Sequence, residues 1–405
     1  MSSSGTVTQT APTDHGASGN DHAPRLPSIT GLRFIAAFGV FAYHVMPLLP
    51  SLPLIHPLLM AGQAGVSFFF ILSGFVLTWS YRFGDPARSF WRRRVARIVP
   101  NHVVTWAIGI PVAVARFGAW PHFGAMLATL TLVQSWIPES AVFFGVNGVA
   151  WSLSCEALFY ALFPWLIGPV LRLGARGRLV VMAGCLAILA ALQLGVWAAV
   201  GSVVANSNRA PFWWVSVLPL SRLPEFVFGM CAAALLRDAA TRWRDRTQAG
   251  HRYDGSALPV SLAGLLALVT IYGAGEFPIV LVAGWLTLIP FTLLICAAAW
   301  SDVVGRAGLM ARSWAVRLGE WSFAFYLVHQ LVLRIVQWAW GHLPDRMSAT
   351  DWRLAQIAID LALAVLASGA LYRFVEVPFE RRLRPRRQPR ELALKVSQPA
   401  GSPPE

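Results

Sequence analysis

The sequence has few charged residues. Only 13% of its 405 residues are Asp, Glu, Lys or Arg, whereas 56% are hydrophobic. Soluble domains are about 25% charged, so the composition excludes an ordinary soluble protein and indicates an integral membrane protein. The formal net charge of +14 does not favour nucleic-acid binding. The arginines cluster in short connectors between apolar runs, where they set the orientation of multi-pass membrane proteins.

Cysteine pairs and clusters of metal ligands are also missing. The four cysteines fall within or beside apolar segments, without Cys-x-x-Cys spacing and without clustered histidines. Neither a disulfide framework nor a metal site is therefore predicted. The N-terminus lacks the basic-then-apolar pattern of a signal peptide. Residues 1–27 are expected to form a disordered cytoplasmic tail, and residues 384–405 a basic, Pro-rich cytoplasmic tail.

Apolar runs of membrane-spanning length are abundant. A helix needs roughly 20 apolar residues to cross the hydrocarbon core, and eleven segments are candidates, of which the fourth is short. They lie near 31–49, 64–82, 98–116, 123–137, 151–171, 179–203, 213–236, 257–275, 280–300, 314–340 and 354–376.

The basic connectors predict how these segments are oriented. The connector 82–97, RFGDPARSFWRRRVAR, is the most basic and is expected in the cytoplasm. If segment 123–137 crossed the membrane, the later basic connectors would lie outside; if it is re-entrant or interfacial, they all lie inside. The second arrangement is favoured. The prediction is an all-α polytopic membrane protein with about ten transmembrane helices, both termini cytoplasmic, and one membrane domain over 28–383.

Two ionisable residues occupy the first span, in GLRFIAAFGVFAYHVMPLLP. Arg33 and His44 are eleven residues apart, about three helical turns, so their side chains share one face roughly 16 Å apart along the axis. A molecule entering from the cytoplasm would meet Arg33 first and His44 near mid-membrane. The alternative is that Arg33 reaches the lipid headgroups and His44 bonds a neighbouring helix.

Other charged residues are candidates for the same site. Arg94 and Arg97 share a helical face if the third span begins near them, and clustered guanidinium groups suit phosphates. Orientation signalling or contact with anionic lipid would explain them equally well. Glu156 lies inside the span that follows NGVAW. It is expected to pair with a cation, and His44 is the obvious partner because a carboxylate beside histidine stabilises imidazolium.

A late span carries a polar stripe. In GEWSFAFYLVHQLVL, Ser322, Tyr326 and His329 are four and then three residues apart, on one helical face. A lone histidine in a span is usually a packing residue, but three polar groups in line favour a functional site. The pair Arg222 and Glu225, at i and i+3, is expected to be structural, as are Asp360 and Glu376.

Taken together, these motifs resemble those of the membrane-bound acyltransferase-3 family, whose members O-acylate sugars, surface polysaccharides and some macrolides. The resemblance covers roughly residues 28–383. Its elements are Arg33 with ten residues to His44, FFFILSGFVL, RRRVARIVP with Arg94 and Arg97, AWSLSCEALFY with Glu156, RLPEFVFGM, and SFAFYLVH ending in His329.

The resemblance implies roles for the candidate residues. His44 would be the general base, with Arg33 its companion in the motif and Glu156 the family's buried acidic residue. Arg94 and Arg97 would match the family's cytoplasmic arginines, which we expect to hold the phosphates of an acyl-CoA donor. The late motif of Ser322, Tyr326 and His329 would position the acceptor or stabilise the oxyanion. The chain would thus be an acyl-CoA-dependent O-acyltransferase of the cell membrane that needs no metal.

The acceptor would be a hydroxyl of a surface glycan, a lipid-linked sugar or a glycosylated metabolite such as a macrolide, and acetyl is the default acyl group. Two alternatives belong to other classes: a multispan transporter of an organic anion or proton-coupled solute, and a non-catalytic membrane scaffold. The sequence leaves open whether His44 or His329 moves the proton. Cys155 precedes Glu156 where the family is expected to have valine, but buried cysteines are usually inert.

Overall fold

The computed structural model describes residues 24–49, 54–200, 210–248, 258–274, 282–340 and 349–383. Most of the two expected tails lies outside these ranges. The described residues form helices, turns and short connections, and none of them forms a strand. The chain is an all-α polytopic membrane protein, as the apolar runs predict.

The helices follow one another with short connections. Those of at least fifteen residues are α1 (Pro27–Val45), α3 (Gly65–Trp79), α4 (Ala87–Phe117), α7 (Trp151–Arg172), α8 (Ala175–Val200), α10 (Pro219–Gln248), α11 (Leu258–Ala274), α13 (Thr287–Val303), α14 (Ser313–Trp340) and α15 (Ala349–Leu371). The shorter ones are η1 (Met46–Leu48), α2 (His56–Met60), η2 (Ala61–Ala64), α5 (Phe123–Leu130), η3 (Gln134–Trp136), α6 (Ser140–Phe143), α9 (Ala210–Phe212), η5 (Trp213–Val217), η6 (Val282–Leu286), η7 (Leu309–Ala311), η8 (Tyr372–Glu376) and α16 (Val377–Leu383).

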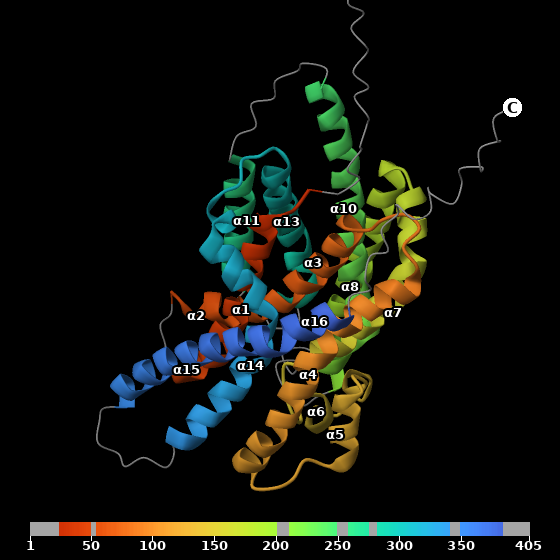
Figure 1. Cartoon of the computed structure of the whole chain (residues 1–405). Helices are drawn as coiled ribbons and strands as arrows, with labels where there is room; N and C mark the ends of the chain where they lie inside the picture. The colour runs from red at the N-terminus through yellow and green to blue at the C-terminus, as the bar shows by residue number, and fades with distance from the viewer. Residues whose placement is uncertain are drawn as a thin grey trace, which may run out of the picture.

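Eight helical segments among the described residues are long and apolar enough to span a membrane. They correspond to α1 with η1, α3 with α2 and η2, α4, α7, α8, α10 with η5, α13 with the end of η6, and α15 with η8 and α16. The sequence predicts two more at α11, which has 17 residues, and at α14, which has 28. In Figure 1, α8, α10, α11 and α13 rise together, whereas α14 and α15 slope away side by side.

The segment around 123–137, expected to be re-entrant or interfacial, does not form a spanning helix. Helix α5 has only eight residues, and it ends because Leu132 adopts a left-handed conformation with φ of 59°. The following Gln134 is buried and donates to the carbonyl oxygen of Ala150 at 2.8 Å, while Ser135 donates to that of Trp151 at 2.7 Å. These bonds attach the segment to the first turn of α7.

Small residues allow close contact between α3 and α10. A Cβ atom at Gly74 would overlap the carbonyl oxygen of Phe226, and one at Gly229 would overlap the carbonyl oxygen of Ile71. Glycines commonly permit such approach between membrane helices. This packing brings α3 and α10 together beside α1, which contains the Arg33–His44 motif.

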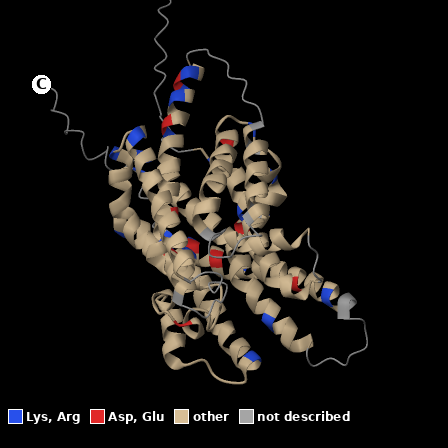
Figure 2. Cartoon of the chain, turned by 180° about the vertical axis from the view of Figure 1, so that it is seen from behind, with Lys and Arg blue, Asp and Glu red and all other residues tan. Residues whose placement is uncertain are grey.

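Basic connectors gather at one end of the bundle. Arg178 pairs with Asp238, Arg237 donates to the carbonyl oxygen of Tyr81 at 3.3 Å, and Arg97 pairs with Glu380 at 2.9 Å. The Pro24 carbonyl oxygen accepts from Trp79 Nε1 at 3.0 Å. Both ends of the described chain therefore lie at this end, where Figure 2 shows basic positions on the upper part of α10 and on neighbouring helices.

Candidate functional site

Three adjoining cavities contain most of the predicted residues. The arginine cavity, about 330 Å³, is lined by Arg33, Arg94, Arg97, Glu156 and others. The histidine cavity, about 380 Å³, is lined by His44. A connecting cavity of about 50 Å³ lies between them, with Arg33 and Glu156 at one end and Val66 and Tyr326 at the other. It shares Arg33, Glu156, Phe69 and Phe323 with the arginine cavity, and Val66 and Tyr326 with the histidine cavity.

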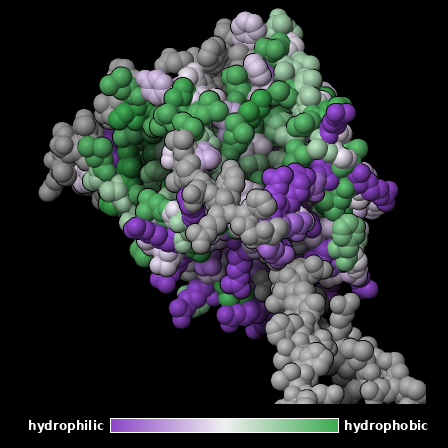
Figure 3. All heavy atoms as spheres, turned by 90° about the horizontal axis from the view of Figure 1, so that it is seen from above, coloured by the Kyte–Doolittle hydropathy of each residue, from purple (hydrophilic) through white to green (hydrophobic). Residues whose placement is uncertain are grey.

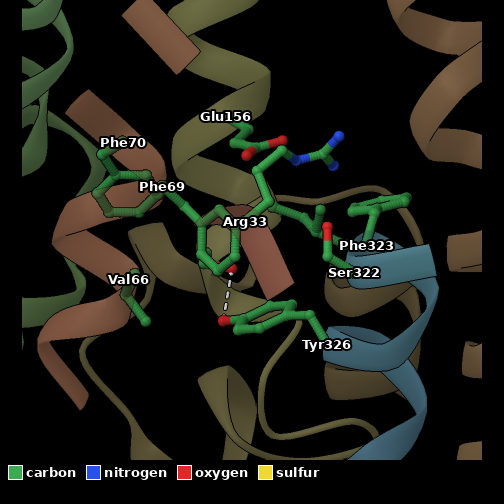
Figure 4. Close-up of a pocket in the computed structure, with 10 residues that line it drawn as sticks. Arg33, Val66, Phe69, Phe70, Glu156, Ser322, Phe323 and Tyr326 are labelled. Carbon is green, nitrogen blue, oxygen red and sulfur yellow. Dashed lines mark hydrogen bonds between the residues drawn. The ribbon is translucent and has the colours of Figure 1, made fainter. Parts of the chain in front are cut away.

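The path through the cavities follows α1. Because Arg33 lines its first part and His44 its last, the face predicted for both residues is the face that borders the path. The stripe on α14 forms another wall, since Ser322 and Tyr326 line the connecting cavity from below the ring of Phe323 (Figure 4). Residues far apart in the sequence thus border a series of adjoining cavities.

The two candidate histidines are in contact. Nδ1 of His44 lies 3.3 Å from Nε2 of His329, and the ring centroids are 5.1 Å apart. His329 is fully buried, packed between the rings of Phe325 and Phe41. His44 is only partly buried and lines the histidine cavity, whereas His329 lines none of the three cavities. His44 therefore lies between His329 and the open space.

Backbone carbonyls determine which nitrogen of each ring carries hydrogen. His44 Nδ1 is 2.8 Å from the carbonyl oxygen of Val40, and His329 Nδ1 is 3.2 Å from that of Phe325. A carbonyl oxygen only accepts, so both Nδ1 atoms donate and both Nε2 atoms keep a lone pair. The lone pair of His329 faces the Nδ1–H of His44. The lone pair of His44 is left without a protein partner among the described residues.

The expected pairing of Glu156 with His44 is wrong. Glu156 accepts a hydrogen bond from Tyr160 at 3.1 Å, and it lies beside Arg33 at the boundary of the arginine and connecting cavities (Figure 4). The physical reason is depth in the bundle. The side chain of Glu156 lies at about the same depth in the bundle as Arg33. His44 is three turns further along α1, where it contacts His329.

The two arginines of the RRRVAR motif differ in their surroundings. Arg97 forms ion pairs with Glu376 at 2.5 Å and Glu380 at 2.9 Å, so two carboxylates compensate its charge. Arg94 has no ion pair within the described part of the chain, and its guanidinium lies 5.8 Å from the ring centroid of Phe90 and 5.9 Å from that of Tyr160. Its Nε is buried without a hydrogen-bond partner. Arg94 therefore has unused hydrogen-bonding capacity in the arginine cavity.

Tyr326 stands where the connecting and histidine cavities meet. Its hydroxyl lies 2.9 Å from Ser152 Oγ, shown as the dashed line in Figure 4, and 3.1 Å from the Val149 carbonyl oxygen. Ser322 donates to the Gly319 carbonyl oxygen of its own helix at 2.7 Å. Tyr326 is thus held in place by α7, while Ser322 is bonded within α14.

Arg334 lies within the apolar segment 314–340 and is not among the residues to which the sequence assigns a role. Arg334 lines the histidine cavity together with Gln330, Gln63 and Trp151. It donates to the Val146 carbonyl oxygen at 3.1 Å and has no carboxylate partner among the described residues. The sequence does place Arg334 five residues after His329, nearly one and a half turns along α14. This proximity was the signal that could have indicated a role at the same site.

The pair that the sequence predicts to be structural is present. Arg222 and Glu225 form an ion pair at 3.2 Å, as their i and i+3 spacing predicts. Across the described ranges, no group of three or more His, Cys, Asp and Glu side chains is arranged to hold a metal ion.

Comparison with known proteins identifies the family. The acyltransferase-3 model, described as an acyltransferase domain, matches residues 26–373. The chain belongs to the acyltransferase-3 family. It is 36% identical to the acyltransferase MdmB of Streptomyces mycarofaciens over 385 residues, which cover 90% of this chain and 94% of that protein. This acyltransferase is therefore a multi-pass membrane protein with its polar residues gathered along an internal path.

Two further relatives are more distant. The exopolysaccharide production protein ExoZ of Rhizobium meliloti is 29% identical over 344 residues, covering 83% of this acyltransferase and 95% of ExoZ. The O-acetyltransferase OatA of Staphylococcus aureus is 24% identical over 384 residues, covering 89% of this chain but 58% of OatA. No solved structure matches the chain.

Proposed function

We propose that this membrane acyltransferase moves an acyl group, acetyl by default, from cytoplasmic acyl-CoA to a hydroxyl of a sugar-containing acceptor. The observation that carries the proposal is the series of adjoining cavities that leads from Arg94 to His44. Among the described residues, Arg94 has no ion pair and the Nε2 lone pair of His44 has no protein partner. A cation at one end suits phosphates. His44 is a base about 16 Å from Arg33 along α1, a separation that suits the reacting end of an extended thioester.

The donor would occupy the arginine and connecting cavities. Arg94 and Arg33 are the cations there without a carboxylate ion pair among the described residues, so they would bind the donor's phosphates. Arg97 would organise this end indirectly, through Glu376 and Glu380. The pantetheine arm would pass between Glu156 and Phe323 and then past Tyr326, which line the narrow connecting cavity (Figure 4). The thioester would then lie beside His44.

The proton would move through His44. Its Nε2 accepts the proton of the acceptor hydroxyl while that oxygen attacks the thioester carbonyl carbon. The C–S bond then breaks, and the imidazolium returns its proton to the thiolate of CoA. During this step the Nδ1–H of His44 donates to the Val40 carbonyl oxygen and faces Nε2 of His329. His329 would thus stabilise the imidazolium of His44, which is the role that the sequence analysis expected of Glu156.

The acceptor would bind in the histidine cavity. Trp151, Tyr43 and Phe144 give this cavity aromatic walls, while Arg334 and Gln330 add a donor group and an amide. Sugars need both kinds of surface, because each hydroxyl donates and accepts while the ring has apolar faces. A surface glycan, a lipid-linked sugar or a glycosylated macrolide would each present such a group. The relative ExoZ, an exopolysaccharide production protein, is consistent with a glycan acceptor.

The orientation follows from the basic end of the bundle. Because the connectors around Arg82–Arg97, Arg178 and α10 meet there, the positive-inside rule favours the cytoplasm for this end. Both ends of the described chain would then face the cytoplasm, as would the mouth of the arginine cavity. The histidine cavity would open toward the opposite side of the cell membrane.

The test is CoA release by purified protein in lipid nanodiscs, with acetyl-CoA and a panel of hydroxylated acceptors. Wild type is compared with His44→Ala and with His56→Ala, a control histidine that is exposed and lines none of the three cavities. We expect acceptor-dependent CoA release by wild type and His56→Ala, and none by His44→Ala. Equal release by all three proteins would contradict the role of His44. Solute uptake without CoA release would favour a transporter.

A further inference from the structure

A fourth cavity lies next to the arginine cavity at the basic end of the bundle. We call it the flanking cavity; its volume is about 330 Å³. Its lining includes Arg25, Arg33, Arg82 and Arg237, together with Val76 and Trp79. It shares Arg33 and Val76 with the arginine cavity, so the two spaces meet at Arg33.

The lining of the flanking cavity is strongly cationic. Four of its residues are arginines and none is Asp or Glu, whereas the arginine cavity includes Glu156 and Glu380. Seen from above, this end of the molecule carries a dense group of hydrophilic residues beside apolar ones (Figure 3). A cavity of this charge suits an anion with several negative oxygens.

Two of the arginines are available for such an anion. Arg237 uses Nη1 to donate to the carbonyl oxygens of Thr78 at 2.7 Å and Tyr81 at 3.3 Å. Its Nη2 and Nε make no hydrogen bond within the described part of the chain. Its neighbour Asp238 is paired with Arg178. Arg25 is exposed and has no ion pair or hydrogen bond among the described residues.

The protein holds this cavity in a defined shape. The bonds from Arg237 fix the end of α3, and Trp79 Nε1 donates to the Pro24 carbonyl oxygen at 3.0 Å. Ser28 Oγ donates to Asp302 Oδ1 at 2.6 Å and the Ser28 amide donates to Oδ2 at 2.9 Å. These contacts attach the chain on both sides of Arg25 to α3 and α13. A preorganised cationic site loses little entropy when it binds an anion.

We propose that the flanking cavity binds the 3′-phosphate of the CoA donor through Arg25 and Arg237. This rests on the proposed function, and it divides the donor's negative charge between two adjoining cavities. The pyrophosphate would lie between Arg33 and Arg94, and the ribose 3′-phosphate beyond Arg33. The donor would then be recognised by its nucleotide end, in addition to its thioester.

The experiment measures binding of CoA and of 3′-dephospho-CoA in nanodiscs, without any acceptor or turnover. We expect wild type to bind CoA at least tenfold more tightly than 3′-dephospho-CoA. Arg25→Gln and Arg237→Gln should each weaken CoA binding about tenfold and leave 3′-dephospho-CoA binding unchanged. Arg244→Gln is the matched control, because Arg244 is an exposed arginine of α10 that lines none of the four cavities. Its preference for CoA should equal that of wild type.

Several results would overturn the proposal. Equal weakening of both ligands in the two variants would place Arg25 and Arg237 away from the 3′-phosphate, while the proposed function would stand. Absence of CoA binding by wild type would refute the acyl-CoA donor itself, and this inference with it. Arg237 also bonds to the end of α3, so Arg237→Lys, which keeps the positive charge, is measured beside Arg237→Gln. Arg25→Gln tests the site without loss of any observed bond.

Anionic lipid headgroups carry the same phosphate chemistry, so the nanodiscs are made both with phosphatidylcholine alone and with added phosphatidylglycerol. The nucleotide assignment requires the preference for CoA in phosphatidylcholine alone. If the effect of Arg25→Gln is seen only with phosphatidylglycerol, the cavity is a lipid site and the proposal is wrong.

Discussion

His44 and His329 lie 3.3 Å apart, Nδ1 to Nε2, although 285 residues separate them in the sequence. Each ring also donates its Nδ1–H toward a carbonyl oxygen four residues earlier in its own helix. The contact therefore gives the two histidines different positions relative to the cavity. His44 presents a lone pair to the cavity, and His329 supports it from the protein side.

The first prediction concerns His329. Because its Nε2 lone pair faces His44, His329→Gln retains an acceptor at about the same place, whereas His329→Leu removes it. We expect His329→Leu to lower kcat by about 10²-fold, with little change in the KM for donor, and His329→Gln to recover much of the loss. Steady-state kinetics with both substrates measure this split. An equal loss in both variants would show that the position demands histidine itself, for example as a second proton carrier.

The second prediction separates Arg94 from Arg97. Arg97→Gln would leave the carboxylates of Glu376 and Glu380 without their ion-pair partner. We expect a loss of stability on the order of 3 kcal/mol, seen as a lower thermal unfolding temperature and partly restored by Glu376→Gln in the same chain. Arg94→Gln should leave stability nearly unchanged and raise the KM for acyl-CoA about tenfold. The reverse pattern would contradict the assignment of Arg94 to the donor.

The third prediction concerns the acceptor. Arg334 lines the histidine cavity and not the arginine cavity, so Arg334→Gln should raise the KM for acceptor about tenfold without changing that for acyl-CoA. Arg116→Gln serves as the control, because Arg116 is an exposed arginine that lines neither cavity. A change in donor KM alone would place Arg334 on the donor side.

The fourth prediction tests the helix packing that supports the site. A methyl group at Gly229 would overlap the backbone carbonyl of Ile71, so Gly229→Ala should force α3 and α10 apart and destabilise the protein by about 2 kcal/mol. Gly184→Ala is the control, since nothing lies within 4 Å of a Cβ atom placed there. Thermal unfolding in detergent compares the two. Equal thermal unfolding midpoints for the two variants would mean that α3 and α10 accommodate the methyl group without loss of stability.

Much of the architecture is predictable from the sequence because it depends on local properties. Long apolar runs have to be helical in lipid, since every backbone polar group needs a partner there. The same periodicity places Arg33 and His44 on one face of α1, and Ser322, Tyr326 and His329 on one face of α14. The pairing of Arg222 with Glu225 is likewise a matter of spacing on one helix.

Contacts between helices depend on depth and rotation, which no single helix contains. The sequence indicated that Glu156 needs a partner but suggested His44, whereas the bundle places Glu156 near Arg33 and gives His44 to His329. It grouped Arg94 with Arg97, yet only the fold brings Glu376 and Glu380 to Arg97. The residue types and their helical faces were determined by the sequence alone. Which charges are neutralised, and which remain available to a substrate, was decided by tertiary packing, because pairing energy depends on the distance between groups that distant segments bring together.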